Sequence, residues 1–221
     1  MKTKNHTQTI STLAALAGLA LAAGSAHAAT TIPILNGDFE LSDTSIGNGN
    51  NTNIDNWTED VGNAYVDYGQ GWTPETTDML YIGNAAVNQD LSHNWSATDS
   101  FTLEMIAMNP AWSGGATEFK VQLRQASDDV VLWDSGDMDV TGAVLSGPVY
   151  ADPAKHIFSW NIDASAFATG SAGEQINVRI AAVTGTVYAD NVSLSVSAVP
   201  EPTTTALLGL GGLALILRRR K

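Results

Sequence analysis

Three tryptophans lie in polar, turn-rich surroundings, where a large aromatic side chain is unusual. They are Trp72, which follows Gly-Gln-Gly, Trp95, which lies within Ser-His-Asn-Trp-Ser, and Trp112, which precedes Ser-Gly-Gly. An exposed indole ring can stack on the C–H face of a sugar while nearby amides and carboxylates bind its hydroxyls. These three residues are therefore candidate ligand-binding platforms. The alternative for each is a loop side chain that folds back and packs on the domain.

The sequence contains no recognisable catalytic constellation. Between residues 30 and 199 the histidines are His93 and His156, without the spacing of a zinc protease and without a Gly-x-Ser-x-Gly nucleophile elbow. Cysteine is absent, which excludes thiol catalysis, zinc–thiolate sites and disulfides. Acidic residues are abundant, but no motif singles out the carboxylate pair that a glycosidase needs. The residues favour a binding protein over an enzyme.

The region between the two ends of the chain is strongly acidic. The chain has 10 Lys and Arg and 23 Asp and Glu, but six of the basic residues lie among the first four and last four positions. With Glu201 also set aside, residues 30–199 hold four basic and 22 acidic residues, a formal charge of −18. Four scattered cations cannot neutralise a phosphate backbone, which excludes nucleic-acid binding, and anionic lipid surfaces are disfavoured for the same reason.

Apolar residues in this region recur with a period of two, which predicts β-strands. Phe119, Val121 and Leu123 alternate with charged or polar residues, and Ile176, Val178 and Ile180 do the same. Gly, Asn and Asp fill the gaps between strands, and the pattern predicts a two-sheet antiparallel sandwich in one domain. The expected strands are Ile32–Leu35, Ala64–Tyr68, Met79–Ile82, Phe101–Met108, Phe119–Arg124, Val130–Trp133, His156–Ile162, Ile176–Ile180 and Val187–Val196.

The first 28 residues have the three parts of a secretory signal peptide. Lys2 and Lys4 form a basic start, Leu13–Ala23 is apolar, and Ala26-His27-Ala28 is a small-x-small cleavage site. The apolar stretch is shorter than the ~20 residues that span a bilayer, which argues against a membrane anchor. We expect cleavage after Ala28 and a folded domain over residues 29–198.

The C-terminal residues 199–221 combine a proline-containing strip, a short apolar run and a cationic end. Each proline removes a backbone donor and favours extended geometry, so the strip is accessible to a processing enzyme. The positive-inside rule would hold the cationic end in the cytoplasm. The residues that define these parts are Pro200, Glu201 and Pro202, the run Ala206–Leu217, and Arg218, Arg219, Arg220 and Lys221.

This order of parts resembles the PEP-CTERM sorting tail of Gram-negative bacteria. The resemblance implies a hydrophobic sorting helix that is held transiently in the inner membrane and an exosortase that cleaves near Pro-Glu-Pro. It further implies delivery to the cell surface or extracellular matrix. A plain C-terminal membrane anchor is the alternative, which the shortness of the apolar run disfavours.

Two short motifs make the sandwich more specific. Asn36-Gly37-Asp38-Phe39-Glu40 near the mature N-terminus and Tyr188–Leu194 near the end of the domain resemble the opening and closing signatures of galactose-binding-like jelly rolls, a fold shared by many carbohydrate-binding modules. Trp57 matches a core tryptophan of that family, although Asn56 replaces the usual preceding glycine. The resemblance implies an all-β jelly-roll sandwich. It implies sugar binding less strongly, because one fold hosts many functions.

In that family a structural calcium ion often lies where the first and last strands meet. Transferred to this sequence, the resemblance implies Glu40 and Asp190 as carboxylate ligands, with Asp38 as a further candidate. The chemistry is suitable, because Ca²⁺ prefers six to eight oxygen ligands and tolerates irregular geometry. The alternative is that these acids are ordinary surface residues or turn caps.

The leading hypothesis is an exported, non-catalytic protein that binds or associates with extracellular polysaccharide. A second hypothesis is a structural or adhesive surface protein without a sugar site, cross-linked through divalent cations. A third and weaker one is a polysaccharide-cleaving enzyme. Glycan binding that depends on the loop tryptophans would distinguish the first hypothesis from the second.

Overall fold

The computed structural model describes residues 29–40, 54–67, 78–110, 115–142, 144–145, 157–167, 170 and 172–198. Residues Ala29–Ser197 form one compact unit. Trp72, Trp112, the signal peptide with Ala26 and Ala28, and the tail with Pro200 to Pro202 and Arg218 to Arg220 lie outside the described ranges. In the described part no helix is long and apolar enough to cross a membrane.

The described chain is almost entirely β-structure, apart from the 3-10 turn η2 (Ala164–Ala166). The strands are β1 (Thr30–Ile32), β2 (Thr58–Asp67), β3 (Met79–Asn94), β4 (Asp99–Pro110), β5 (Glu118–Gln125), β6 (Val131–Asp134), β7 (Met138–Asp139), β8 (Val144–Leu145), β9 (Ile157–Asp163), β10 (Gln175–Thr184) and β11 (Thr186–Ala198).

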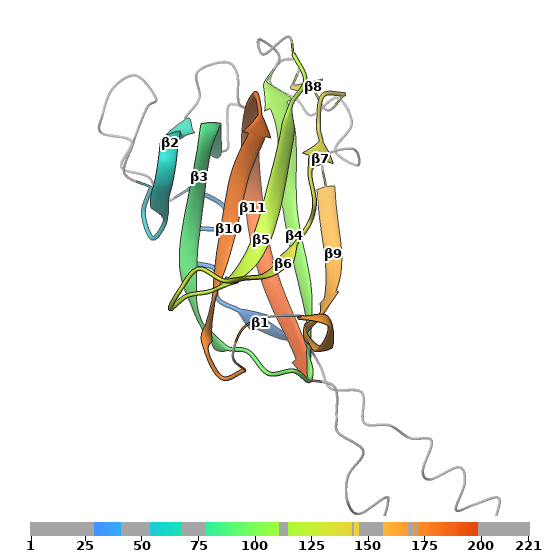
Figure 1. Ribbon diagram of the computed structural model, residues 1–221. Helices are drawn as coiled ribbons and strands as arrows, with labels where there is room; N and C mark the ends of the chain where they lie inside the picture. The colour runs from blue at the N-terminus through green and yellow to red at the C-terminus, as the bar shows by residue number, and fades with distance from the viewer. Residues whose placement is uncertain are drawn as a thin grey trace, which may run out of the picture. The chain divides into compact units, whose positions relative to one another are not determined.

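One continuous sheet folds over β3 to make two layers, with β10 and β5 in front of β11 and β4 in Figure 1. The first half of β3 pairs with β11, with Tyr81 opposite Tyr188, and its second half pairs with β10, with Val87 opposite Ile180. The β10 layer continues through β5 to β6 and β7, and the β11 layer continues through β4 to β9 and β8. β5 pairs antiparallel with β10, β6 and β7, and β4 pairs antiparallel with β9 and parallel with β8. The architecture confirms the predicted all-β jelly-roll sandwich.

The core lies between the two layers and is built from the alternating apolar residues that the sequence shows. Phe119, Val121 and Leu123 of β5 are fully buried, as are Ile176, Val178 and Ile180 of β10. From the opposite layer, alternate residues Phe101, Leu103 and Met105 of β4 join the same cluster. Burial of these side chains removes apolar surface from water at about 25 cal/mol per Å², which is the main stabilisation of a domain without disulfides.

Most strand boundaries differ from the prediction by a few residues, and β2 begins at Thr58, six residues before the predicted start at Ala64. The first strand ends at Ile32 instead of continuing to Leu35, because Pro33 cannot donate a ladder hydrogen bond. β3 continues to Asn94, twelve residues beyond the predicted end at Ile82. Asn88 and Asp90 of this extension bond to β10, where Asn177 Nδ2 donates to Asn88 Oδ1 at 3.0 Å and to Asp90 Oδ1 at 2.7 Å.

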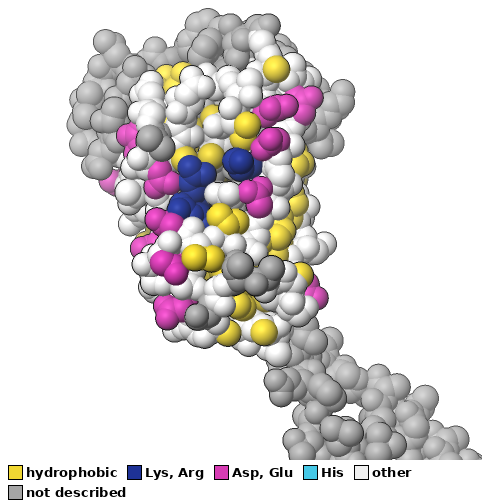
Figure 2. All heavy atoms as spheres, viewed as in Figure 1, with side chains coloured by type: hydrophobic (Ala, Val, Ile, Leu, Met, Phe, Trp, Pro, Cys, Tyr) yellow, Lys and Arg dark blue, Asp and Glu magenta, His cyan; other side chains and the backbone are white. Residues whose placement is uncertain are grey.

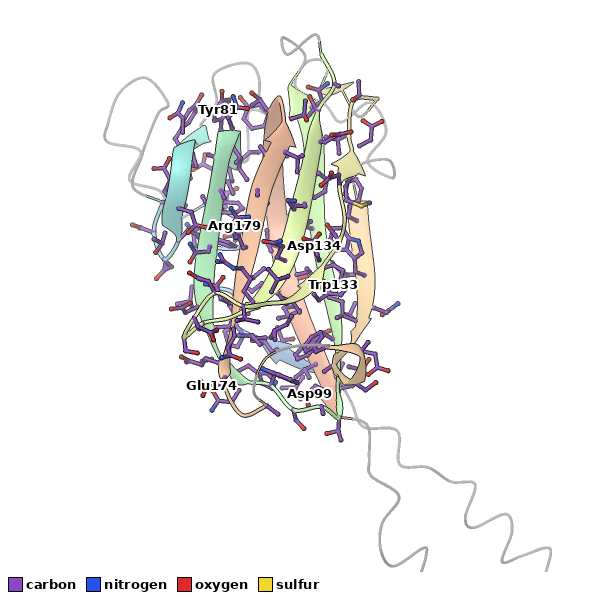
Figure 3. The ribbon with its side chains drawn as sticks, in the orientation of Figure 1. Tyr81, Asp99, Trp133, Asp134, Glu174 and Arg179 are labelled. Atoms are coloured by element: carbon purple, nitrogen blue, oxygen red, sulfur yellow. The ribbon has the colours of Figure 1, made fainter. Side chains whose placement is uncertain are left out.

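The outer face of the β10 layer carries the described cations. Lys120, Arg124 and Arg179 alternate with core residues on β5 and β10, so their side chains point away from the core. Asp60 bridges two of them, with its Oδ2 2.8 Å from Arg179 Nε and 3.5 Å from Arg124 Nη1. Figure 2 shows this cationic cluster near the middle of the face, with acidic side chains around it, and Figure 3 places Arg179 within it.

Candidate functional site

A bulge in β11 orients the carboxylate of Asp190. This carboxylate lies among those of Glu40, Asp38 and Asp78, and we call the group the acidic centre. Val187 and Ala189 belong to the core before the bulge, and Val192 and Leu194 belong to it afterwards, so the inward-facing positions change parity. Asn191, with a positive φ of 52°, supplies the extra residue. The carboxylate of Asp190 therefore points to the opposite side of the sheet from the core, although Asp190 is only 2 % exposed.

Asp190 is held in a strongly acidic environment. The pKa of its carboxyl is raised to about 7, mainly by burial and in smaller part by the charges of Glu40, Asp38 and Asp78, while a hydrogen bond from the Asn191 backbone N–H acts in the opposite direction. That N–H donates to Asp190 Oδ1 at 2.7 Å. Glu40 is tied to the same region, since its Oε1 accepts a 3.1 Å hydrogen bond from the backbone N–H of Asp78. The structure thus brings the predicted residues Glu40, Asp38 and Asp190 into one electrostatic neighbourhood.

The donor set suits a hard cation, because every candidate ligand is a carboxylate oxygen. Among the described residues, however, no three acidic or histidine side chains are arranged to hold a metal ion. Asp78, which is buried beside the two predicted carboxylates, was not expected from the sequence. Asp78 lies near Glu40 and Asp190 because of tertiary contacts, which a local sequence motif does not reveal.

A groove of about 730 Å³ lies next to the acidic centre, on the outer face of the β11 layer. The outward-facing residues Glu104 and Ile106 of β4, Ile157 of β9, and Asn191 and Ser193 of β11 line it. Residues between Ile34 and Glu40 line the rest, including Asp38. We call this the β11 groove. Glu104 belongs to it, and no sequence pattern distinguished Glu104 from the other acids.

The opening motif, Asn36-Gly37-Asp38-Phe39-Glu40, forms one side of the β11 groove. Close contacts with β11 and with the core restrict which residue types fit at Gly37 and Phe39. The carbonyl of Gly37 accepts a 2.8 Å hydrogen bond from the Val192 N–H. A Cβ at residue 37 would lie 2.3 Å from the Val192 carbonyl oxygen, so the close approach requires glycine. Phe39 is fully buried against Trp57 at 5.5 Å between ring centroids, and Trp57 Nε1 donates to the Asn36 carbonyl at 3.2 Å. The core position that the resemblance implied for Trp57 is confirmed, and Phe39 belongs to the same core.

Three tyrosines lie in register on the same outer face, and we call them the tyrosine row. Tyr65 of β2 pairs with Tyr81 of β3, which pairs on its other side with Tyr188 of β11. The rings of Tyr65 and Tyr81 are stacked with centroids 4.1 Å apart, and both residues are half-buried. Tyr81 also packs against a small apolar cluster of Met79, Met108 and Tyr188, to which Ile106 of the β11 groove belongs. The row and the groove therefore form one continuous face, and Figure 3 shows Tyr81 near one end of the sandwich.

The prediction that Trp95 is a loop residue available to a ligand is wrong. It is 5 % exposed and belongs to the core, where its ring contacts Phe167 edge-on at 5.1 Å. β3 runs up to Asn94 with strand geometry, so the polar residues that suggested a loop are the outward-facing residues and the end of a strand. Trp95 closes the end of the sandwich and is not a surface platform. In the described part of the chain, Tyr65 and Tyr81 present half-buried rings on the outer face and Tyr188 is fully buried beside them; the sequence analysis selected none of the three.

Comparison with known proteins supports the sorting motif at the C-terminus and the jelly-roll fold of the domain. A sequence model of the PEP-CTERM protein-sorting motif matches residues 198–221. The C-terminus is a PEP-CTERM sorting motif. Such a motif indicates a secreted surface protein that an exosortase processes. No curated protein matches the chain significantly.

Among solved structures, a cyclase from Fischerella sp. TAU is similar with a TM-score of 0.55 and 18 % identity over 79 % of this chain and 100 % of the cyclase. The tandem CBM22-1–CBM22-2 domain of Paenibacillus barcinonensis Xyn10C is similar with a TM-score of 0.50 and 13 % identity over 81 % of this chain and 49 % of the tandem. A CBM4 structure has a TM-score of 0.43 and 14 % identity over 75 % of this chain and all of its own. Structural relatives thus include carbohydrate-binding modules with the jelly-roll fold, as the resemblance implied. At these identities the likeness shows the fold alone.

Proposed function

We propose that this protein binds polysaccharide at the cell surface or in the extracellular matrix, as a non-catalytic module that an exosortase has sorted there. The observation that carries the proposal is the continuous face of the β11 layer, on which the tyrosine row adjoins the β11 groove. Aromatic rings beside a groove lined with carboxylates, amides and a hydroxyl supply the stacking surface and the hydrogen-bond acceptors and donors that sugar recognition uses.

The absence of catalysis is part of the proposal. The groove-lining carboxylates Asp38, Glu40 and Glu104 are all exposed, and none of them lies in the apolar, buried surroundings that prepare a carboxyl to act as a general acid. The likeness to a cyclase and the likeness to carbohydrate-binding modules both concern the fold, so neither decides the chemistry. Reducing-end assays on the polymers that bind should show no release of new ends.

Replacing Tyr81 by Ala should weaken binding to a polysaccharide by about 2- to 12-fold, since an aromatic contact contributes about 0.5–1.5 kcal/mol. Affinity gel electrophoresis with the polymers that score on a glycan array would measure the change. Tyr81→Phe keeps the ring and should retain most of the affinity. The same affinity in wild type and Tyr81→Ala, with unchanged melting temperatures, would place the binding site elsewhere.

We propose further that a calcium ion binds at Asp190 with Glu40 and Asp38 as candidate partners. The support is the concentration of carboxylates around a buried Asp190, whose mutual repulsion a divalent cation would relieve. Glu40 and Asp38 would contribute oxygens from the opening motif, and the ion would fasten that motif to β11.

Millimolar calcium should therefore raise the melting temperature of the protein, and the gain should be larger at pH 8 than at pH 5, because the ion needs the ionised form of Asp190. Differential scanning calorimetry with calcium or EDTA would measure it. Asp190→Ala should lose the calcium-dependent gain. Equal melting temperatures with calcium and EDTA at pH 8 would exclude the ion. Calcium-dependent self-association without glycan binding would favour the structural, cross-linking alternative.

A further inference from the structure

The described cations are confined to one outer face of the sandwich, where acidic side chains pair with them. Each cation of the described domain, Lys120, Arg124 and Arg179, lies on β5 or β10 and points outward from the β10 layer. The β11 groove lies on the outer face of the other layer, and its described lining contains three carboxylates and no Lys or Arg. Charges of one sign gathered at a concave surface attract ligands of the opposite sign and repel ligands of the same sign.

The lining of the β11 groove is also partly apolar. Ile106 and Ile157 are cross-strand partners on β4 and β9, and Ile157 is 57 % exposed. Glu104 and its partner Ser159 form the adjacent row, where the Ser159 hydroxyl donates to Glu104 Oε1 at 3.1 Å. A carboxylate therefore lies directly beside an isoleucine pair on the wall of the groove. A matching ligand presents positive charge next to apolar C–H or methyl surface.

We propose that the β11 groove binds an amino-sugar polymer that carries free amines, which deepens and rests on the proposed polysaccharide binding. The ammonium groups pair with Glu104 and, in the calcium-free groove, with Asp38, and the ring C–H groups or remaining N-acetyl methyls pack on Ile106 and Ile157. Polymers of uronic acids are repelled by the same carboxylates. Fully N-acetylated polymers keep the apolar contacts but lose the ion pairs.

Isothermal titration calorimetry of the exported chain at about pH 6 in EDTA would test this with three matched probes. These are a hexamer of β-1,4-linked glucosamine, the hexamer of N-acetylglucosamine and a hexamer of galacturonic acid. We expect the glucosamine hexamer to bind about 2- to 30-fold more tightly than the N-acetylated one, because two exposed ion pairs contribute modestly. We expect no binding of the uronic acid hexamer. High salt should remove most of the preference, since exposed charges are screened over a few ångströms at about 1 M.

Glu104→Gln isolates the charge contribution of the groove. It should lower the affinity for the glucosamine hexamer by about 1.4- to 5-fold and leave the affinity for the N-acetylated hexamer unchanged. Glu174→Gln is the matched control, because Glu174 is exposed and lies near the opposite end of the sandwich from Tyr81 in Figure 3. It should change neither affinity.

The possible outcomes distinguish failure of the amine preference from failure of the proposed polysaccharide binding. Equal affinity for both amino-sugar hexamers, or tighter binding of the uronic acid hexamer, would overturn the amine preference and leave polysaccharide binding intact. Oligolysine serves as a fourth, non-sugar probe, and tighter binding of oligolysine than of the glucosamine hexamer would show recognition of charge alone and would also overturn the amine preference. Failure of all glycans, including those of the array, would overturn the proposed function itself.

Discussion

Asp190→Asn should make the protein more stable than the wild type at pH 8 in the absence of calcium. The pKa of Asp190 is about 7 in the folded protein against a usual 3.8, so the folded state binds this proton more tightly than the unfolded state. Between these two values the free energy of unfolding of the wild type falls by about 1.4 kcal/mol per pH unit, roughly 4 kcal/mol in all. Asparagine is neutral at every pH and avoids that loss.

Urea unfolding at a series of pH values in EDTA would measure the effect. The difference between variant and wild type should be small or negative near pH 4, because the wild-type carboxyl is then protonated and the variant loses the bond from Asn191 Nδ2 to Asp190 Oδ2. It should grow in favour of the variant up to pH 8. Asp38→Asn, which removes one exposed neighbouring charge, should give a smaller effect of the same sign. If the stability difference between variant and wild type does not vary with pH, the pKa of Asp190 is not raised by folding.

Phe39→Ala should cost about 3–5 kcal/mol of stability, as truncation of a fully buried aromatic ring does. Phe39 lies in a turn with a positive φ of 55°, which is unfavourable for a bulky residue, so packing against Trp57 must hold it there. Because most domains are stable by about 5–15 kcal/mol, this single change would remove a large part of the total. It would also release one side of the β11 groove.

Chemical denaturation of Phe39→Ala, with Phe39→Leu beside it, would check this result. The leucine variant keeps most of the apolar volume and should lose much less stability. Loss of glycan binding in Phe39→Ala at temperatures where its circular dichroism spectrum is still that of the folded protein would connect the anchor to the groove. A cost below about 1 kcal/mol would mean that the opening motif contributes little to the fold.

The strands that the sequence predicted best have apolar alternation on one face and charges on the other, as in β5 and β10. Alternation of this kind depends only on neighbours along the chain. The extension of β3 was missed because its stability comes from bonds between Asn88, Asp90 and Asn177, which are distant in sequence. Trp95 was misjudged for the same reason, since its polar neighbours belong to the exposed face and the end of that strand.

The acidic centre was partly predictable and the rest of the face was not. Glu40 and Asp190 belong to the two motifs that resemble jelly-roll signatures, and that resemblance implied that they meet; the structure places them in one neighbourhood. The tyrosine row depends on the strand order β2-β3-β11, in which neighbours along the sheet come from three separate segments. Asn191 gives one signal that was available, because the apolar residues before and after it change from odd to even positions.

The position of β11 determines how the domain would carry mechanical load. This strand holds Asn191 and Ser193 of the β11 groove and ends at Ala198, next to the sorting motif. A pull on the chain beyond Ala198 would therefore reach a bound polymer along a single strand. β1 pairs with β11 from Ile32 opposite Leu194 to Thr30 opposite Val196, and β4 lies on its other side. Tension directed along β11 would load the hydrogen bonds to both neighbours in shear, so that they resist together instead of opening one after another.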